Sequence, residues 1–150
     1  IKTWAETDGT RQPRPRIQNI YYHHGYYDGK EKKFRGFRHV ENVLEGDDSI
    51  DKRLDEIFYN VGDTDSYFHG KLLRRLITDG SGKVFDETSI LWNDCGTPSG
   101  AAKGLDPPVR FICIKSQERT IKEGLTDTSR WKMTRDERVY DGYGNVTLDS

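Results

Sequence analysis

The sequence predicts a mainly β protein, built from antiparallel strands that Asp-Gly hairpins join. Short segments rich in β-branched and aromatic residues recur along the 150-residue chain, and strands favour these residues. Turn signals stand between the segments, at Asp28-Gly29, Asp79-Gly80 and Asp141-Gly142, as in consecutive hairpins. Hydrophobic residues make up 33% of the chain and charged residues another 33%, so the apolar core is thinner than in a typical soluble domain.

The first 43 residues predict an extended connection followed by a hairpin. Residues 1–16 contain two prolines among arginines, and proline biases the chain towards extended conformation, so this segment is expected as a connection. Residues 17–27 and 34–43 are expected as two paired strands. Between them, Asp28-Gly29 predicts a tight type I′ turn, because glycine accepts the positive φ that this turn requires. Gly36 within the return strand indicates a β-bulge or a close backbone approach.

One short helix is expected near residues 49–59. Ile50, Leu54, Ile57 and Phe58 follow the spacing of one helical face, and Asp48 and Ser49 are good N-cap residues in front of them.

The second half of the chain predicts further strands and one loop. Residues 71–78 and 83–92 flank the turn signal at Asp79 and are expected as a hairpin. Residues 93–108 are rich in Gly and Pro and predict a loop. Residues 109–114 are apolar on both faces and predict a buried strand. Residues 131–139 alternate between apolar and polar side chains, which is typical of a half-exposed strand, and another strand is expected to begin at Val146.

Residues 1–150 are expected to form a single β-rich unit that is a fragment of a much larger chain, because the sequence starts at Ile1 without an initiator Met and stops just past a turn. No apolar run approaches the length that spans a membrane. Cys95 and Cys113 could form a disulfide, but the favoured interpretation is a small buried hydrophobe and a loop thiol.

The sequence predicts no metal, cofactor or catalytic site. His23 and His24 are neighbours on an expected strand, so their side chains should point to opposite faces. His39 and His69 could approach one of them in space, but no set of three or four zinc ligands has a recognisable spacing. The chain lacks the G-x-S-x-G motif and a phosphate-binding glycine loop before a helix. These observations favour a protein that is not an enzyme.

Aromatic side chains interleaved with cations around residues 21–37 are also typical of a platform for single-stranded nucleic acid. The isoelectric point near 6.5 argues against that partner. Cross-strand aromatic pairs explain the same residues as sheet-stabilising contacts, so no nucleic acid partner is expected.

Three motifs are the most distinctive features of the sequence. The first motif, in YYHHGYYDG and FRGF, contains Tyr22, Gly25, Tyr26, Tyr27, Asp28, Gly29, Phe34, Arg35, Gly36 and Phe37. The second motif is the segment Tyr67–Arg74. The third motif contains Tyr140, Asp141, Gly144 and Asn145. In this order the three motifs resemble the B components of bacterial insecticidal toxin complexes and the related Rhs/YD-repeat proteins with Salmonella-plasmid-virulence-like N-terminal regions. The resemblance covers roughly residues 17–148; Arg38 departs from it, since the family usually has glycine there.

The resemblance implies a non-enzymatic, structural segment of a larger Rhs/YD-repeat β-sheet shell. Members of this family are large bacterial proteins, secreted or associated with the cell surface, whose shell encloses a toxic C-terminal polypeptide. The partners that it implies are neighbouring shell segments of the same chain, a toxin C component and a pore-forming A component. The motif residues would then be structural, and no cofactor is implied.

Two alternatives remain open from the sequence. One is a surface module that binds a glycan or a host protein through exposed Tyr and Trp side chains, among them Tyr21, Tyr22, Tyr26, Tyr27 and Trp92. The other, less favoured, is an enzyme in which His23 or His24 shares a cleft with Asp or Glu. Burial of the aromatic side chains would argue against the first, and such a cleft would support the second.

Overall fold

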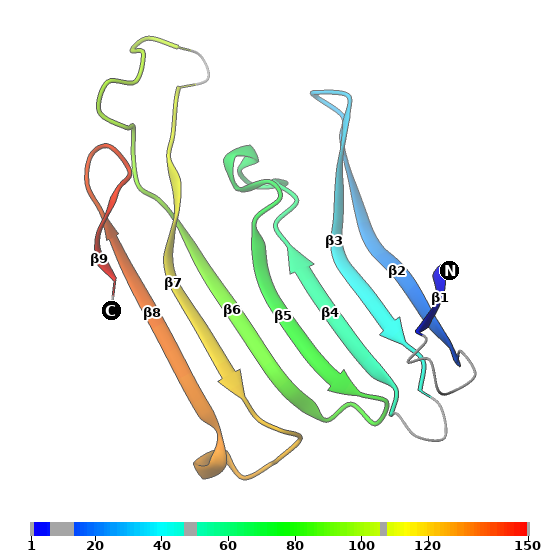
Figure 1. Ribbon diagram of the computed structural model, residues 1–150. Helices are drawn as coiled ribbons and strands as arrows, with labels where there is room; N and C mark the ends of the chain where they lie inside the picture. The colour runs from blue at the N-terminus through cyan, green and yellow to red at the C-terminus, as the bar shows by residue number, and fades with distance from the viewer. Residues whose placement is uncertain (1, 7–13, 47–50, 106–107, 150) are drawn as a thin grey trace.

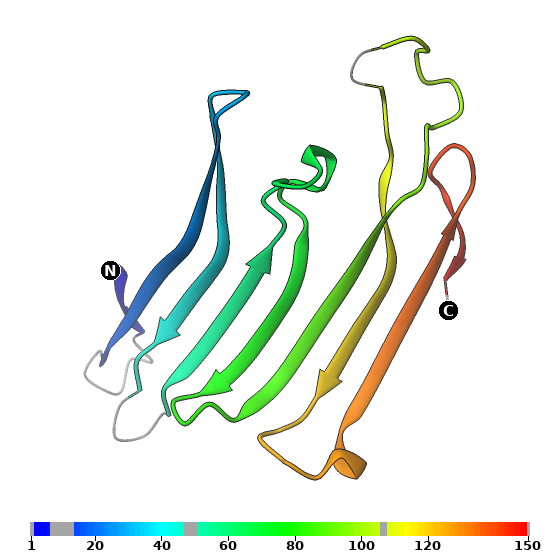
Figure 2. The ribbon, with the colours of Figure 1, turned by 180° about the vertical axis from the view of Figure 1, so that it is seen from behind.

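The chain folds into one antiparallel sheet in which each strand pairs with its neighbours in sequence. The computed structural model describes residues 2–6, 14–46, 51–105 and 108–149. Nine strands follow one another across the sheet in the order of the chain, and Figures 1 and 2 show this meander from its two sides. The prediction of a mainly β, antiparallel fold is confirmed.

The strands are β1 Lys2–Glu6, β2 Arg14–Asp28, β3 Lys33–Leu44, β4 Arg53–Tyr59, β5 Leu72–Asp79, β6 Val84–Asp94, β7 Ile112–Ile121, β8 Lys132–Tyr140 and β9 Val146–Asp149. The only helical elements among the described residues are two single-turn 3-10 helices, Ser66–Phe68 and Thr128–Arg130. Neither is long and apolar enough to cross a membrane.

The sheet is open and forms a single layer, with β1 and β9 at its two edges (Figure 1). Its accessible surface is 10712 Å², whereas a compact monomer of this mass exposes about 7,900 Å². The buried apolar side chains of the described residues are Val43, Val61, Leu76 and Cys113. The two faces of the sheet therefore remain largely uncovered in the described part of the chain.

Alternating charges link the central strands on one face. Asp55 of β4 is 8% exposed and accepts two hydrogen bonds from Arg75 of β5, one of them from Nε at 2.7 Å. The hydrogen bonds to Asp55 raise the pKa of Arg75, and the negative charge of Asp86 on β6 raises it further. Arg119 of β7 in turn donates to Asp86, with Nη2 2.5 Å from Oδ2. Four side chains of alternating sign thus bridge four strands where an apolar core is thin.

The helix expected near residues 49–59 is wrong. Residues 49 and 50 lie outside the described residues, and Arg53–Tyr59 is strand β4. This strand pairs with β3 on one side and β5 on the other. The helical spacing of its apolar residues was outweighed by hydrogen bonding to two neighbours, and the run Ile57–Tyr59 is β-branched and aromatic, as strands favour. The partner of the buried Asp55, Arg75, comes from β5, and local sequence does not show this pairing.

Part of the segment 1–16 also differs from the expected connection. Lys2–Glu6 and the first residues of β2 are extended, but they pair with each other as antiparallel strands, with Lys2 opposite Gln18. The remaining residues of that segment, Ile1 and 7–13, lie outside the described residues.

The other strand predictions are confirmed in position, except for the buried strand expected at residues 109–114: β7 instead covers Ile112–Ile121, and of its residues only Cys113 and Thr120 are buried. The hairpin of β5 and β6, the loop before β7 and the half-exposed strand β8 lie where the sequence placed them, although β7 begins only at Ile112. Cys95 and Cys113 form a disulfide, with their Cα atoms 6.0 Å apart. The favoured interpretation of two unpaired cysteines is therefore wrong, because the loop returns the chain so that the two Cα atoms come within disulfide range.

Candidate functional site

The first motif forms the hairpin of β2 and β3, which projects beyond the end of the neighbouring β4–β5 hairpin (Figures 1 and 2). Its aromatic residues pack over a glycine. A Cβ atom at Gly25 would lie 3.2 Å from Phe37 and 3.4 Å from Phe34, and these two rings meet edge to face with centroids 5.2 Å apart. Phe37 also contacts Tyr22, at a centroid distance of 4.8 Å. Glycine at position 25 thus leaves room for the cross-strand aromatic cluster.

A β-bulge in β3 sets the register of this hairpin. Gly25 lies opposite Phe37 while Tyr27 lies opposite Phe34, so β3 carries one extra residue, and Gly36 has a φ of 93°. Glycine adopts this conformation without the strain of a Cβ atom. The bulge predicted at Gly36 is confirmed.

The turn of the hairpin is confirmed, but its predicted type is wrong. β2 ends at Asp28 and β3 begins at Lys33, so the loop has four residues, and its left-handed residue is Lys32, with a φ of 52°. Asp28 Oδ1 accepts the amides of residues 30 and 31 at 3.0 Å and 3.1 Å. These bonds, and Arg35 at 3.0 Å from Oδ2, hold the pKa of Asp28 below its usual value. The aspartate side chain, rather than a glycine at positive φ, organises the turn.

Arg35 ties the hairpin together from inside. It is 7% exposed and bridges Asp28 and Glu31, the latter at 2.7 Å. Its backbone carbonyl lies 2.7 Å from Nε2 of His69, in the second motif. The second motif, which lies in the connection between β4 and β5, therefore contacts the first motif on the neighbouring strand β3.

The second motif also contacts the loop that precedes β7. The Tyr67 hydroxyl donates a hydrogen bond to the carbonyl of Pro108, and the Arg110 guanidinium lies 4.6 Å from the centre of the Tyr67 ring. Arg110 further pairs with Asp65 at 2.8 Å and with Asp94 at 2.7 Å. At one end of the sheet, these contacts thus link the connection between β4 and β5 to the loop between β6 and β7, although the two segments are far apart in sequence.

The third motif forms the turn between β8 and β9. Asp141 Oδ1 accepts the backbone amides of Tyr143 and Asn145 at 2.8 Å and 2.9 Å, and Oδ2 accepts Asn145 Nδ2 at 2.9 Å. The bonds from Asn145 are the main cause of the lowered pKa of Asp141. Gly144 has a φ of 91° and lies against the Phe111 ring. Tyr140, Asp141, Gly144 and Asn145 thus act together as one turn.

The exposed tyrosines do not all lie on one face of the sheet. Tyr21 and Tyr22 are both exposed, but as consecutive strand residues they point to opposite faces. Tyr26 and Trp92 are half-buried, and Trp92 Nε1 donates to the Leu72 carbonyl at 2.7 Å. The arrangement argues against the aromatic binding module.

If the hairpin is structural, Tyr22 or Tyr27 is expected to be substantially buried together with Phe37, and for the two tyrosines this expectation is wrong. Tyr22 is 55% exposed and Tyr27 is 59% exposed, while Phe37 is half-buried. The open sheet leaves both faces of this hairpin uncovered, so cross-strand contact does not bury these rings.

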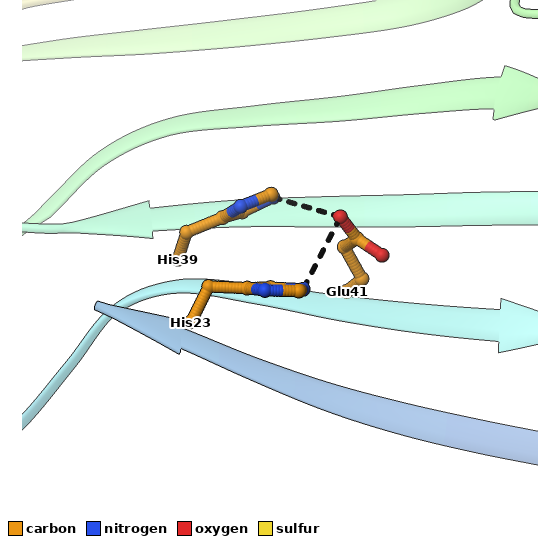
Figure 3. A group of neighbouring side chains, drawn as sticks. All are labelled: His23, His39 and Glu41. Atoms are coloured by element: carbon orange, nitrogen blue, oxygen red, sulfur yellow. Dashed lines mark ion pairs between the residues drawn. The ribbon is translucent and has the colours of Figure 1, made fainter. Parts of the chain in front are cut away.

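A cluster of titratable side chains lies on the hairpin next to the first motif. His23 of β2 lies directly opposite His39 of β3, and Glu41 follows two residues later on the same face. His23 Nε2 is 3.4 Å from Glu41 Oε1, and His39 Nε2 is 3.8 Å from the same oxygen. Figure 3 shows both imidazole rings directed towards the Glu41 carboxylate. We call His23, His39 and Glu41 the histidine cluster.

The histidine cluster is held by ring packing. The rings of His23 and His39 stack with centroids 5.1 Å apart, and His39 lies flat on Phe58 of β4 at 4.4 Å. Glu56 of β4 approaches from the other side, with Oε1 3.3 Å from His39 Nε2. The Nε2 atoms of His23 and His39 are buried, and no described group hydrogen-bonds to them.

The cluster was not predicted from the sequence, although the spacing of two of its residues indicates that they share one face of a strand. His39-Val40-Glu41 on a strand places the histidine and the carboxylate on one face. The pairing of His23 with His39 could not be read from the sequence, because it depends on the loop length and the bulge. His24 has a φ of 54°, so the simple alternation assumed for the two adjacent histidines is interrupted there. His24 does not belong to the cluster.

Two open hollows lie elsewhere on the sheet. One is lined by residues that include Phe37, Val40 and Val61, and the other by residues that include Lys115 and Tyr140. Neither includes a member of the histidine cluster, so neither supplies the cleft that would support an enzyme at His23 or His24.

The fold is that of a segment of Tc toxin complexes. The chain superposes on a TcdB2-TccC3-TEV crystal structure with a TM-score of 0.71 at 14% identity, over 88% of this chain and 9% of that one. The Photorhabdus luminescens Tc holotoxin pore gives a TM-score of 0.73 at 13% identity, over 87% and 8%. A TcdB2-TccC3-Cdc42 structure gives 0.67 at 13%, over 89% and 9%.

These similarities concern the fold. No protein-family model and no curated protein sequence matches the chain. The chain spans 8% to 9% of the length of the solved structures that it resembles.

Proposed function

We propose that this chain is a non-enzymatic structural segment of a toxin-complex-type Rhs/YD-repeat shell that encloses a toxic polypeptide. The observation that carries the proposal is the open, single-layer meander, which superposes over 87% of its length on the Tc holotoxin pore. In the described part of the chain, a single layer leaves both faces largely uncovered and ends in the edge strands β1 and β9, as suits a wall that continues on both sides and separates an interior from an exterior.

The thin core supports the same role. A sheet that must be stable alone covers at least one face with apolar packing, whereas the described side chains here bury few apolar groups. The sheet is instead braced by charged pairs and by aspartate-organised turns. Residues 1–150 then form one unit of a larger chain, and the motif residues serve to shape its hairpins rather than to bind a ligand.

The proposed partners follow from this role. Neighbouring shell segments of the same chain would pair with the edge strands β1 and β9, a toxin C component would complete the shell, and a pore-forming A component would receive the cargo. The proposed location is outside the bacterial cell or on its surface. The Cys95–Cys113 disulfide supports this location, because disulfides persist in oxidising compartments.

Protease protection of the full-length protein tests the proposal. The protein is produced together with its candidate C component and treated with a broad-specificity protease, before and after denaturation of the shell. We expect a cargo-sized polypeptide to survive only while the shell is folded. Equal digestion of the cargo in both states would contradict enclosure.

A further inference from the structure

We propose that the histidine cluster binds a divalent transition-metal ion, zinc in the first place, with His23, His39 and Glu41 as ligands and Glu56 beside them. The ion would bridge β2 and β3 on one face of the sheet and approach β4 through Glu56. Nothing in the proposed shell function requires this site, so the two proposals stand independently.

The spacing of the ligand atoms fits one ion. In a tetrahedral zinc site with bonds of about 2.0–2.2 Å, two ligand atoms lie about 3.3–3.6 Å apart. The Nε2 atoms of His23 and His39 are 3.4 Å and 3.8 Å from Glu41 Oε1, and one potential ligand atom from each of the three residues lies within 4.8 Å of the other two. Small side-chain movements therefore suffice to place them around a common centre.

The two imidazole nitrogens also lack hydrogen-bond partners among the described residues. Both Nε2 atoms are buried without a hydrogen bond from any described residue, although carboxylate oxygens stand within 4 Å of each. A buried polar atom without a partner is costly and calls for an explanation. A metal ion bonded to both nitrogens would satisfy them together, as Figure 3 allows by the common direction of the rings.

The ligands are positioned before any ion arrives. His23 and His39 stand on paired strands, and the flat contact of His39 with Phe58 fixes the plane of its ring. Glu41 and Glu56 are directly opposite each other on β3 and β4. Sites built on strands hold their geometry more closely than sites on loops, which lowers the cost of organising them on binding.

The ligand set selects the class of metal. Two imidazoles and a carboxylate suit zinc and its neighbours among the divalent transition metals. Calcium and magnesium prefer sites made of oxygen atoms alone, so they fit less well. A bound ion would cross-link adjacent strands of an open sheet that buries few apolar side chains, and a structural role is therefore the expected consequence.

Zinc titration of the full-length protein, followed by calorimetry, tests the site. The test variant is His23→Gln, and the matched control is His24→Gln, the same change at the adjacent residue outside the cluster. We expect the unmodified protein and the control to bind one more equivalent of zinc than the test variant. The zinc affinity of this site should fall by at least about 100-fold in the test variant, because loss of a group that only supports a metal ligand already lowers metal affinity by about 10–100-fold. His39→Gln should give the same loss.

Cobalt binding gives a second, spectroscopic readout of the same site. We expect the unmodified protein to give the visible absorption of four-coordinate Co²⁺ with nitrogen ligands, displaced by zinc, and the His23→Gln protein to lose this signal while its circular dichroism stays unchanged. Equal zinc stoichiometry and affinity in His23→Gln and His24→Gln would overturn the proposal. So would the absence of a zinc-displaceable cobalt spectrum in the unmodified protein.

Discussion

The connection between β4 and β5 contains two glycines whose replacement by alanine should have different costs. Gly62 has a φ of 74° and Gly70 a φ of 76°. A Cβ atom at Gly62 would lie 3.1 Å from the His69 Cβ and 3.2 Å from the Ser66 Cα, whereas nothing lies within 4 Å of one at Gly70. The two positions thus share the conformational cost and differ only in packing.

The expected magnitudes follow from these contacts. A left-handed conformation costs a residue with a Cβ atom about 1–2 kcal/mol, so Gly70→Ala should destabilise the connection by about that amount. Gly62→Ala should destabilise the connection by about 1–3 kcal/mol more than Gly70→Ala. The new Cβ atom would press against Cα and Cβ atoms, which cannot move aside as the end of a flexible side chain can. Since about 1.4 kcal/mol corresponds to a factor of ten, local opening should be about 5- to 140-fold more frequent in Gly62→Ala than in Gly70→Ala.

Hydrogen exchange in the full-length protein measures this local opening. The reporting amides are those of Asn60, which donates to the Lys71 carbonyl at 2.9 Å, and Gly70, which donates to the Asn60 carbonyl at 2.8 Å. Faster exchange in Gly62→Ala than in Gly70→Ala is the expected result. Equal exchange rates in the two variants would contradict the inference that close packing at Gly62 makes alanine more costly there.

Three further predictions concern the turn between β8 and β9, the disulfide, and the aromatic contacts of the β2–β3 hairpin. Hydrogen bonds from Asn145 lower the pKa of Asp141 below 3.8, so ionised Asp141 stabilises its turn above pH 3.8, and this stabilisation should be lost as the pH falls through the lower pKa of the folded state. Hydrogen exchange of the turn amides, corrected for the intrinsic pH dependence of exchange, should show this loss. The Asp141→Asn variant should not show it. Reduction of the Cys95–Cys113 disulfide, which closes a separation of 18 residues, should speed proteolysis of the enclosed loop but not of the β2–β3 hairpin. Phe37→Ala should accelerate exchange in that hairpin through loss of the ring contacts, whereas Tyr143→Ala, at an exposed side chain, should leave it unchanged.

Each of these three expectations has a contradicting result. A pH dependence that persists in the Asp141 variant would assign it to another group. A loop that resists protease equally after reduction would show that the disulfide does not hold it. Equal hairpin exchange in the two aromatic variants would mean that the Phe37 contacts do not stabilise the hairpin.

The fold could be predicted from the sequence where local chemistry decides the structure. Each Asp-Gly signal marks a real hairpin, because the aspartate carboxylate accepts the amides of its own turn, as Asp79 does from Ser81 at 2.8 Å and Lys83 at 3.0 Å. The bulge at Gly36 could also be predicted, because a glycine inside a strand marks a bulge or a close backbone approach. Strand β4 was missed because its conformation is set by its neighbours and not by its own spacing.

The histidine cluster shows where sequence reasoning stops. A two-residue turn at Asp28-Gly29 would place Tyr27 opposite Lys30 and, by the same register, His23 opposite Phe34. The observed loop places Asp28 opposite Lys33, and the bulge adds one more residue, so that His23 meets His39 instead. Small local differences in loop and bulge therefore decide which side chains meet across the strands, as register does in any sheet.

Cryo-electron microscopy of the full-length protein shows directly whether this segment belongs to a shell. We expect residues 17–148 to form part of the wall of a hollow shell, with neighbouring strands of the same chain continuing the sheet beyond β1 and β9. A closed, self-contained domain in which these residues bury a core of their own, without further strands beyond β1 and β9 and without an enclosed cavity, would contradict it.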